Sequence, residues 1–600
     1  MSENVKILKR SEVAEEYTWN LADLYETDEA WEAELVTLQG YIPKLQAFQG
    51  HLMDSAKTLL DFMRLDDELS LKLRSFHGYA MMKNDQDSTV AKYQECSDKA
   101  RTLYVSIASA SSFATPEILA ADDETVERFY KEEPDLELYR VAINRLRARK
   151  AHILSDKEEA ILAQVGRITG TASNAYSTFE SADIKFPDIE WEDGSKTPLT
   201  NGSFIPYMEN ENRAIRKQAF EKLYHTYESY KNTLAALYNG EVKARILNST
   251  VRKYSSNLEA ALSGNEVPTS VYHNLIDAVH TNFGYMHKYM RLRKKLLGVD
   301  ELHMYDIYTS LVPDANVKVS YEDAKKEILE AMQVLGDDYV AMLREGFENR
   351  WIDVYENEGK RSGAYSAGAR PHPYVLLNQK DTLDSEFTIV HEMGHSLHSY
   401  LSMKNQPVAY SDYVIFVAEV ASTCNEALLM QYLLGKTTDK RQRAYLINYF
   451  LEQFRTTLYR QTMFAEFELL TNEMAERGES LTAEALCALY HKLNADYYGD
   501  DVVIDREIDF EWERIPHFYY DFYVFQYATG FSAAIALSRR ILREGEPAVK
   551  DYLKFLSSGC STDPISLLKI AGVDMNSPEP VNDALELFGE LIDELDELLS

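Results

Sequence analysis

A His-Glu-x-x-His motif constrains this chain more than any other feature of its sequence. The motif runs from His391 to His395, and apolar residues flank it at helical spacing. On a helix, His391 and His395 lie one turn apart on the same face, so both imidazoles can reach one metal ion. Glu392 is rotated by about 100° from His391, where it can accept a proton from a metal-bound water. We therefore expect a helix that supplies two metal ligands and a general base.

A catalytic zinc ion needs a third protein ligand, with water in the fourth position. His398 is excluded, because seven residues along a straight helix place it about 10 Å from His391. The next predicted helix, residues 413–430, is apolar but carries Glu419 and Glu426 seven residues apart and hence on one face. One carboxylate would bind the metal, and the other would accept a hydrogen bond from a ligand imidazole. The spacing alone leaves both assignments open.

Several further segments accompany the motif. They are Trp19-Asn-Leu-Ala-Asp-Leu-Tyr25, Gly363-Ala-Tyr365, His372-Pro-Tyr374-Val-Leu-Leu-Asn378, Ala418-Glu419-Val-Ala-Ser-Thr-Cys-Asn-Glu426 and Pro516-His517-Phe-Tyr-Tyr520-Asp-Phe-Tyr523. Together with the motif, they resemble the thimet-oligopeptidase family of zinc metallopeptidases, and within it the bacterial oligoendopeptidase F branch. The resemblance extends over most of the chain.

This resemblance implies a mainly α, two-lobed fold, with the zinc helix at the bottom of a deep substrate channel and a small β element near the active site. It implies one Zn²⁺ per chain, with Glu419 as the third ligand beside His391 and His395, and Glu426 as the supporting carboxylate. The expected reaction is cleavage of internal bonds in short peptides, with Glu392 as the general base. Two alternatives remain: a zinc exopeptidase, or a non-catalytic peptide-binding protein with a structural zinc.

The segment from His517 to Tyr527 supplies further candidates. Tyr520, Tyr523 and Tyr527 have the i, i+3, i+7 spacing of one helical face. In the resembled family, a histidine and one or more tyrosines from this region stabilise the oxyanion of the reaction, a role that suits hydrogen-bond donors. We predict that His517 acts with Tyr523, or failing that with Tyr520, and interpret Tyr527 as core packing.

The remaining sequence predicts a helical protein with little sheet. Residues 1–180 have helical periodicity, with helices that begin near Asp28, Ser55 and Val90 and at Thr115-Pro116. Apolar and polar residues alternate in Ile184–Phe186 and Ile189–Trp191, and Asp193-Gly194 is a turn signal. This pattern predicts a small β-hairpin, without further helix, over residues 183–208. We therefore expect an N-terminal helical lobe over residues 1–200, ending in this hairpin, and a catalytic domain over residues 201–600.

Two local patterns carry further predictions. Tyr374–Leu377 has strand character, and the preceding Pro371 and Pro373 predict a sheet edge, where an extended peptide could add as a strand. His372 between these prolines is interpreted as a turn residue. The basic run Arg291–Lys295 is interpreted as a solvated helix end.

Composition limits the partners and the compartment. The chain has 97 acidic and 63 basic residues, a formal net charge of −34, which argues against nucleic acid or an anionic membrane as a partner. No run of about 18 apolar residues and no signal-peptide core occurs, so we expect a cytoplasmic protein. The four cysteines form no close pair that would indicate a disulfide framework or a cysteine metal site.

Overall fold

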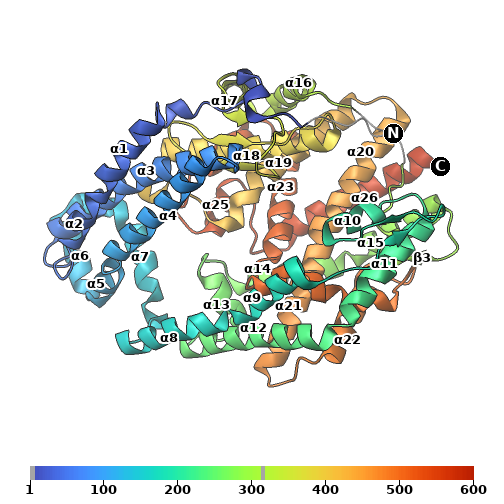
Figure 1. The fold of residues 1–600 in the computed structure, drawn as a ribbon, viewed down its shortest axis with the longest axis horizontal. Helices are drawn as coiled ribbons and strands as arrows, with labels where there is room; N and C mark the ends of the chain where they lie inside the picture. Colours follow the sequence, from blue (N-terminus) through green and yellow to red (C-terminus); the bar gives the residue numbers. More distant parts are fainter. Residues whose placement is uncertain (1–6, 313–317) are drawn as a thin grey trace. The chain divides into compact units, whose positions relative to one another are not determined.

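The structure is a computed structural model that describes residues 7–312 and 318–600. It divides into two compact units. Unit 1 comprises the described residues of Met1–Ala151, Asn316–Leu429 and Leu537–Gly572, and unit 2 those of His152–Ala315, Met430–Ala536 and Val573–Ser600. Helices dominate both units, which confirms the predicted mainly α fold (Figure 1). The predicted division into residues 1–200 and 201–600 stays a prediction.

The helices that begin in unit 1 are α1 (Asp28–Gln39), α2 (Tyr41–Gln46), α3 (Ala56–Gln86), α4 (Ala91–Ser111), α5 (Ala114–Ala120), α6 (Asp123–Glu132), α7 (Arg140–Ala148), α16 (Tyr321–Ala331), α17 (Asp337–Glu348), α18 (Leu383–Asn405), α19 (Ile415–Lys436), α24 (Glu546–Leu556) and α25 (Pro564–Ile570). Its strands are β4 (Ile352–Asp353), β5 (Tyr365–Ala367) and β6 (Tyr374–Leu376).

The helices that begin in unit 2 are α8 (Asp156–Thr169), α9 (Thr171–Thr178), α10 (Asn201–Met208), α11 (Arg213–Glu228), α12 (Lys231–Val251), α13 (Asn257–Ser263), α14 (Thr269–Thr281), α15 (Phe283–Leu297), α20 (Lys440–Gln453), α21 (Arg460–Glu476), α22 (Ala483–Tyr498), α23 (Phe525–Glu544) and α26 (Glu579–Leu599). Its strands are β1 (Ile189–Glu190), β2 (Lys196–Thr197), β3 (Leu302–His303) and β7 (Val502–Val503).

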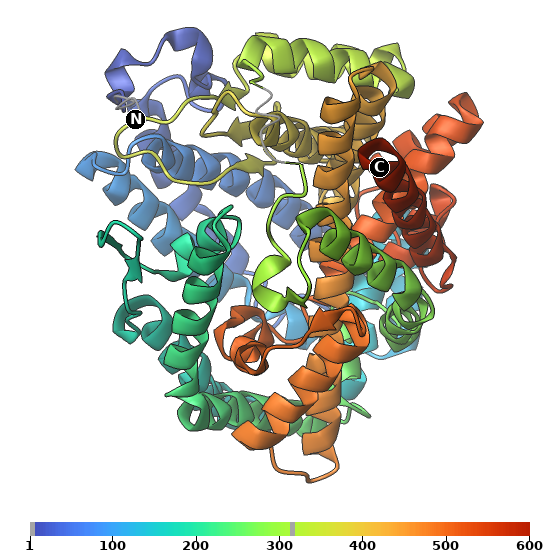
Figure 2. The ribbon, with the colours of Figure 1, turned by 90° about the vertical axis from the view of Figure 1, so that its right-hand side faces the viewer.

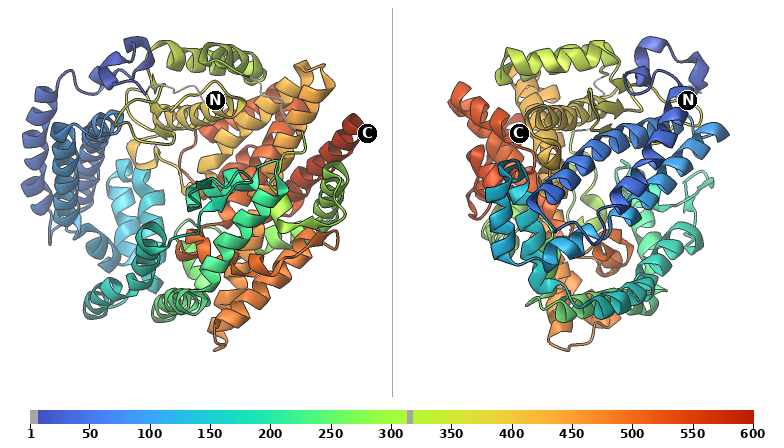
Figure 3. Two further views of the ribbon diagram at one scale, coloured as in Figure 1. Left: turned by 45° about the vertical axis from the view of Figure 1, so that its right-hand side comes forward. Right: turned by 90° about the vertical axis from the view of Figure 1, so that its left-hand side faces the viewer.

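Helices α1, α3 and α4 begin within one residue of the predicted positions, whereas α5 begins at Ala114, so that Pro116 lies in its first turn and not at its first position. The Thr27 side chain caps α1, and Ser55 caps α3, by accepting a backbone N–H of the first turn. Helices α3 and α4 run side by side (Figure 3). Trp31 of α1 is fully buried and stacks on Phe76 of α3, with ring centroids 4.4 Å apart. Aromatic packing of this kind builds the core that supports this end of the unit.

The sheet of unit 1 corrects one prediction. Strand β6 is the middle of three strands, since Val375 pairs with Ile352 of β4 in parallel and with Ser366 of β5 in antiparallel fashion. The predicted edge position for Tyr374–Leu377 is therefore wrong. Pro371 and Pro373 precede the strand, so their missing N–H groups remove no bond from the ladder. The edge within residues 363–380 is β5.

The hairpin of unit 2 is only partly as predicted. Strands β1 and β2 pair in antiparallel fashion around the Asp193-Gly194 turn. Residues 199–207, which we expected to be non-helical, instead form most of α10. The Thr200 side chain caps this helix by accepting the Ser203 N–H, and the helix continues through Pro206.

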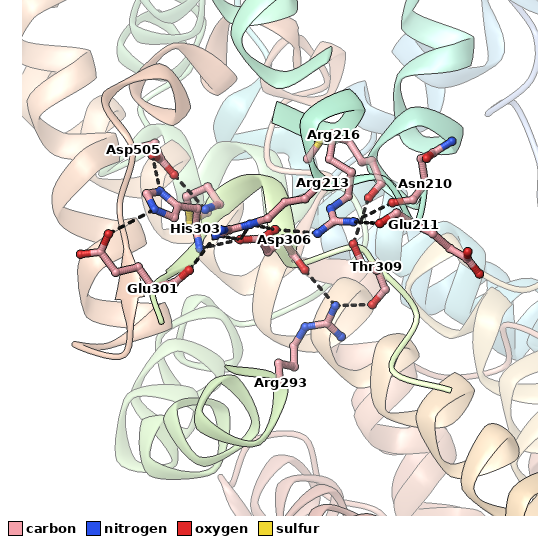
Figure 4. A network of polar contacts seen from close by, with 12 residues as sticks. Asn210, Glu211, Arg213, Arg216, Arg293, Glu301, His303, Asp306, Thr309 and Asp505 are labelled. Carbon is pink, nitrogen blue, oxygen red and sulfur yellow. Dashed lines mark hydrogen bonds and ion pairs between the residues drawn. The ribbon is translucent and has the colours of Figure 1, made fainter. Parts of the chain in front are cut away.

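Helix α15 packs against α22 and α26 (Figure 2) and contains the whole basic run that we interpreted as solvated. That interpretation is wrong for Arg293, which is fully buried. Its guanidinium donates to the carbonyls of Asp306 and Thr309 and pairs with Glu452 at 3.0 Å (Figure 4 shows the two carbonyls). The Asp306 carboxylate is held by Arg213 and Arg216. Partners distant in the sequence therefore make a buried charge tolerable here.

None of the helices formed by residues 7–312 and 318–600 combines the length and the apolar content that a membrane crossing requires. Cys96, Cys424, Cys487 and Cys560 are all free thiols.

Candidate metal centre

The His-Glu-x-x-His motif lies in the middle of α18, as its apolar periodicity predicts. The helix begins after Thr382, whose side chain accepts the Ser385 N–H, and Asp384 in the first turn complements the helix dipole. The apolar side chains that flank the motif are buried and fix the rotation of the helix; they are Phe387, Ile389, Val390, Met393 and Leu397. His391 and His395 therefore leave the helix on the same face, with ring centroids 4.8 Å apart.

Three donor atoms from α18 and α19 converge at this face. The Nε2 atoms of His391 and His395 are 3.2 Å apart, and the Oε2 atom of Glu419 lies 3.3 Å from the first and 3.2 Å from the second. With bonds of about 2.0–2.1 Å, tetrahedral zinc sets neighbouring ligand atoms about 3.3 Å apart. The donor set thus has the chemistry and the spacing of three corners of a zinc site, and it is the one such cluster among the described residues.

The two carboxylates of α19 take different places, which the sequence spacing could not assign. Glu426 hydrogen-bonds with Nδ1 of His391, on the side of the ring opposite the donor cluster. Ser422 donates to the backbone oxygen of Glu419 at 2.9 Å and contacts its Oε2 at 3.2 Å. Glu426 therefore orients the His391 imidazole, while Ser422 restrains the carboxylate that joins the cluster.

Gly394 allows α18 and α19 to approach closely enough for Glu419 to reach the histidines. A Cβ atom at position 394 would lie 2.6 Å from the Cα of Ser422 and 2.9 Å from the oxygen of Ala421. Both are backbone atoms of α19, so no side-chain rotation can make room. The glycine within the motif thus sets the separation of the two helices that carry the cluster (Figure 1).

The electrostatics of the site follow from its five ionisable groups, two histidines and three glutamates. Burial lowers the pKa of His391, but hydrogen bonds to Glu419 and Glu426 outweigh this effect and raise that pKa to about 10. Burial opposes ionisation of Glu419, yet the two imidazoles hold its pKa well below the ordinary value. Burial raises the pKa of Glu392, whose side chain lies beside the cluster at 7% exposure. Glu392 is thus more basic than an ordinary carboxylate.

His398 lies outside the cluster, as the helix geometry predicts. Its ring stacks on Tyr413, with centroids 3.7 Å apart and planes within 1°. Burial, aided by repulsion from His395, lowers the pKa of His398 to about 3, so the ring is neutral. The Tyr413 hydroxyl lies 2.9 Å from Ser399 Oγ. His398 therefore packs α18 against Tyr413.

Comparisons with known proteins agree with this geometry. The sequence model of peptidase family M3 matches residues 206–587, and a model described as oligopeptidase F matches residues 117–186. The chain belongs to peptidase family M3. The resemblance drawn from the motifs is thereby confirmed.

Relatives within family M3 match along almost the whole chain. Oligopeptidase PepF of Bacillus subtilis is 49% identical over 98% of this chain and 88% of its own length. A plasmid-encoded oligoendopeptidase F of Lactococcus lactis is 43% identical over 98% of both chains. The crystal structure of oligoendopeptidase-F from Enterococcus faecium is 37% identical and superposes with a TM-score of 0.73 over 95% of this chain and 99% of that one. The chain is accordingly a family M3 oligopeptidase in sequence and in fold.

In this family M3 chain, strand β5 lies against the motif helix. Ser366 of β5 and Ser396 of α18 have their hydroxyls 2.8 Å apart. Strand β5 is an edge of this three-stranded sheet, since among the described residues it pairs with β6 alone. His372, in the connection between β5 and β6, is buried and stacks on Trp351 with planes within 2°, in agreement with a turn residue.

The C-terminal candidates form a cluster within unit 2, although the helical stripe predicted for them is wrong. Only Tyr527 lies on α23. Tyr520 is the C-cap residue that directly follows the 3-10 helix Pro516–Tyr519, and Tyr523 lies in the loop between this helix and α23. His517 lies close to all three rings, with centroids 5.4 Å from Tyr520, 6.4 Å from Tyr523 and 5.8 Å from Tyr527. Its Nε2 is 3.3 Å from the Tyr527 hydroxyl. Burial lowers the pKa of His517.

Sequence reasoning missed two contributors to the metal centre. Gly394 carries a signal that could have been used, because glycine inside a buried helix costs roughly 1 kcal/mol relative to alanine and implies a packing reason. Ser422 carries a weaker signal, since it follows Glu419 by three residues and serine commonly bonds back to its own helix.

Proposed function

We propose that this chain is a zinc-dependent endopeptidase that hydrolyses internal bonds of short peptides. The observation that carries the proposal is the convergence of His391, His395 and Glu419 with the basic Glu392 beside them. When bound, zinc would polarise the scissile carbonyl and lower the pKa of a water molecule. The names of the relatives, oligoendopeptidase F and oligopeptidase, support the same substrate class.

Each residue then has a defined task. His391, held by Glu426, would bind zinc together with His395 and Glu419. Glu392 accepts the proton of the attacking water and delivers it to the leaving amine.

Further residues bind the substrate and stabilise the developing charge. We propose His517 with Tyr523, and next Tyr520, as the hydrogen-bond donors to the oxyanion. The free edge of β5 would bind the peptide as an added strand, which tolerates many side chains because main-chain groups supply the bonds. The expected cytoplasmic location and the absence of nucleic-acid and membrane partners stay predictions.

The substitution Glu392→Gln tests the proposal, since it removes the proton acceptor but keeps the size of the side chain. We expect the variant to retain one zinc per chain by metal analysis and to lose nearly all turnover of a quenched fluorescent peptide. Turnover close to wild type would remove Glu392 from its role. Loss of zinc together with activity would mean that the variant disturbs the site and does not isolate the base.

A peptide blocked at both ends separates the two peptidase classes. An endopeptidase still cuts this peptide, and mass spectrometry of the products then locates the internal bond. A zinc exopeptidase leaves the same peptide intact while it degrades the unblocked form. A structural-zinc protein would bind zinc and cleave neither peptide.

A further inference from the structure

We propose that Arg245 and Glu468 are positioning residues that fix the loop carrying His517, Tyr520 and Tyr523. This inference rests on the proposed function for its catalytic consequence. Arg245 lies on α12 and Glu468 on α21, and the loop follows the 3-10 helix Arg506–Arg514 and precedes α23. All of these residues belong to unit 2. We call the two residues the Arg245–Glu468 pair.

The pair holds the backbone of the loop at two points, and Arg245 Nε also lies 3.4 Å from Oδ1 of Asp521 in the loop. Arg245 donates through Nη1 to Glu468 Oε1 at 2.7 Å and through Nη2 to the carbonyl oxygen of Phe518 at 2.7 Å. The same Oε1 atom of Glu468 accepts the Phe522 N–H at 2.9 Å. The two backbone contacts therefore bracket Tyr520, one directly after His517 and the other directly before Tyr523.

The backbone between these points has a conformation that needs such support. Asp521 and Phe522 both have positive φ, at 52° and 57°. Two successive non-glycine residues in the left-handed region are disfavoured and persist only where the surroundings determine them. The Phe522 ring is buried against Tyr272, and the Arg245 guanidinium lies 5.7 Å from its centre. The reversal at Asp521 and Phe522 brings Tyr520 and Tyr523 to the same histidine.

The chemistry of the pair suits positioning better than stabilisation. The side chains are 5% and 0% exposed, so both charges have been removed from water. Replacing a buried ion pair with apolar residues of the same volume is often neutral or stabilising. An apolar pair could not hold the Phe518 carbonyl and the Phe522 N–H at fixed positions. The directional bonds to the loop are the property that only these polar side chains supply.

The test uses Arg245→Met and Glu468→Gln in the full chain with zinc bound. Oxyanion donors in other enzymes contribute about 10²–10³-fold to kcat, and a misplacement of about 1 Å can cost about 10²-fold. We expect each variant to lower kcat by at least about 10-fold, with KM within about threefold and zinc content unchanged. Arg245→Lys keeps the charge but not the planar two-pronged geometry, so its kcat should lie between those of wild type and Arg245→Met.

A second readout does not depend on activity. The Phe522 N–H should exchange with deuterium faster in both variants. Glu468→Gln leaves only a neutral amide oxygen as its acceptor, and Arg245→Met removes the guanidinium that holds this acceptor in place. The peptide covering residues 515–527 reports the exchange by mass spectrometry. Exchange as slow as in wild type in both variants would overturn the proposal. Glu468→Gln preserves the shape of the side chain, so it carries the test if Arg245→Met fails to fold.

Arg216→Met is the matched control. Arg216 is 3% exposed, pairs with the buried Asp306 and donates to the carbonyls of Asn210 and Glu211 (Figure 4). It is a buried arginine of the same unit, and its hydrogen bonds go to Asn210, Glu211 and Asp306, outside the loop. Its kcat should stay within about twofold of wild type.

The outcomes separate this inference from the proposed function. If wild type hydrolyses peptide while Arg245→Met and Glu468→Gln keep kcat within twofold, the positioning role is wrong and the peptidase function stands. An equal loss of kcat in Arg216→Met would also overturn it, since general destabilisation would then explain the effect. If wild type cleaves no peptide, the proposed function fails and with it the catalytic consequence claimed for the pair.

Discussion

Gly394→Ala should separate the two helices of the metal centre. The added Cβ would lie 2.6 Å from the Cα of Ser422, whereas ordinary contacts between carbon atoms begin at about 3.4 Å. The backbones must therefore part by roughly 0.8 Å, and Glu419, three residues before Ser422 on the same helix, moves with α19. Zinc sites tolerate only about 0.2 Å in bond length. The third ligand would be displaced well beyond this tolerance.

The effect on zinc binding should be large, although the substitution changes no ligand. Loss of one supporting interaction typically costs 10- to 100-fold in metal affinity, and displacement of a ligand should cost at least this much, or about 1.4–2.7 kcal/mol. Competition with a chromophoric chelator at fixed pH measures the zinc dissociation constant directly. Overpacking should also lower the unfolding free energy by about 1–3 kcal/mol.

Gly435→Ala provides the matched control on the same helix. A Cβ at position 435 meets no atom within 4 Å, so alanine fits without any movement. Because alanine favours helix over glycine by up to about 1 kcal/mol, this variant should be slightly more stable and bind zinc like wild type. Wild-type zinc affinity in Gly394→Ala, measured beside this control, would refute the argument that Gly394 sets the reach of Glu419.

Two further substitutions test the electrostatics of the two units. Glu426→Gln should weaken zinc binding by about 10- to 100-fold, because the charged acceptor that orients His391 is lost, and unchanged affinity in a chelator competition would contradict this role. Glu513 is 1% exposed, and burial raises its pKa to about 9 from an ordinary 4.5. Between these values the unfolded chain is ionised and the folded chain is not, so stability falls as pH rises, by at most about 1.4 kcal/mol per pH unit. Glu513→Gln removes this contribution, so between pH 6 and 8 urea unfolding should show about 2 kcal/mol less loss of stability than in wild type; parallel pH profiles would contradict the raised pKa.

The sequence predicted those parts of the site that depend on the geometry of one or two helices. The helical period places His391 and His395 together regardless of the rest of the fold. The same period puts Glu419 and Glu426 on one face, but it could not assign their roles, because these depend on how α19 packs against α18. The backbone approach at Gly394 decides that packing, and no periodicity contains it.

The errors occurred where a local rule was applied beyond its range. The tyrosine periodicity was counted through Asp521 and Phe522, whose left-handed conformations end any helix. The solvated reading of Arg293 considered only its neighbours in the sequence, while the partner that makes its burial possible, Glu452, is far away along the chain. A proline confines a strand to a sheet edge only when it lies within that strand, whereas Pro371 and Pro373 precede β6.

The metal centre is the central claim, and anomalous diffraction from crystals of the zinc-loaded protein at the zinc absorption edge tests it most directly. The account predicts a single strong peak about 2.0–2.2 Å from Nε2 of His391, Nε2 of His395 and Oε2 of Glu419, with Glu392 beside it and not bonded to it. A peak elsewhere, or zinc held at this position with Glu419 turned away, would contradict the account.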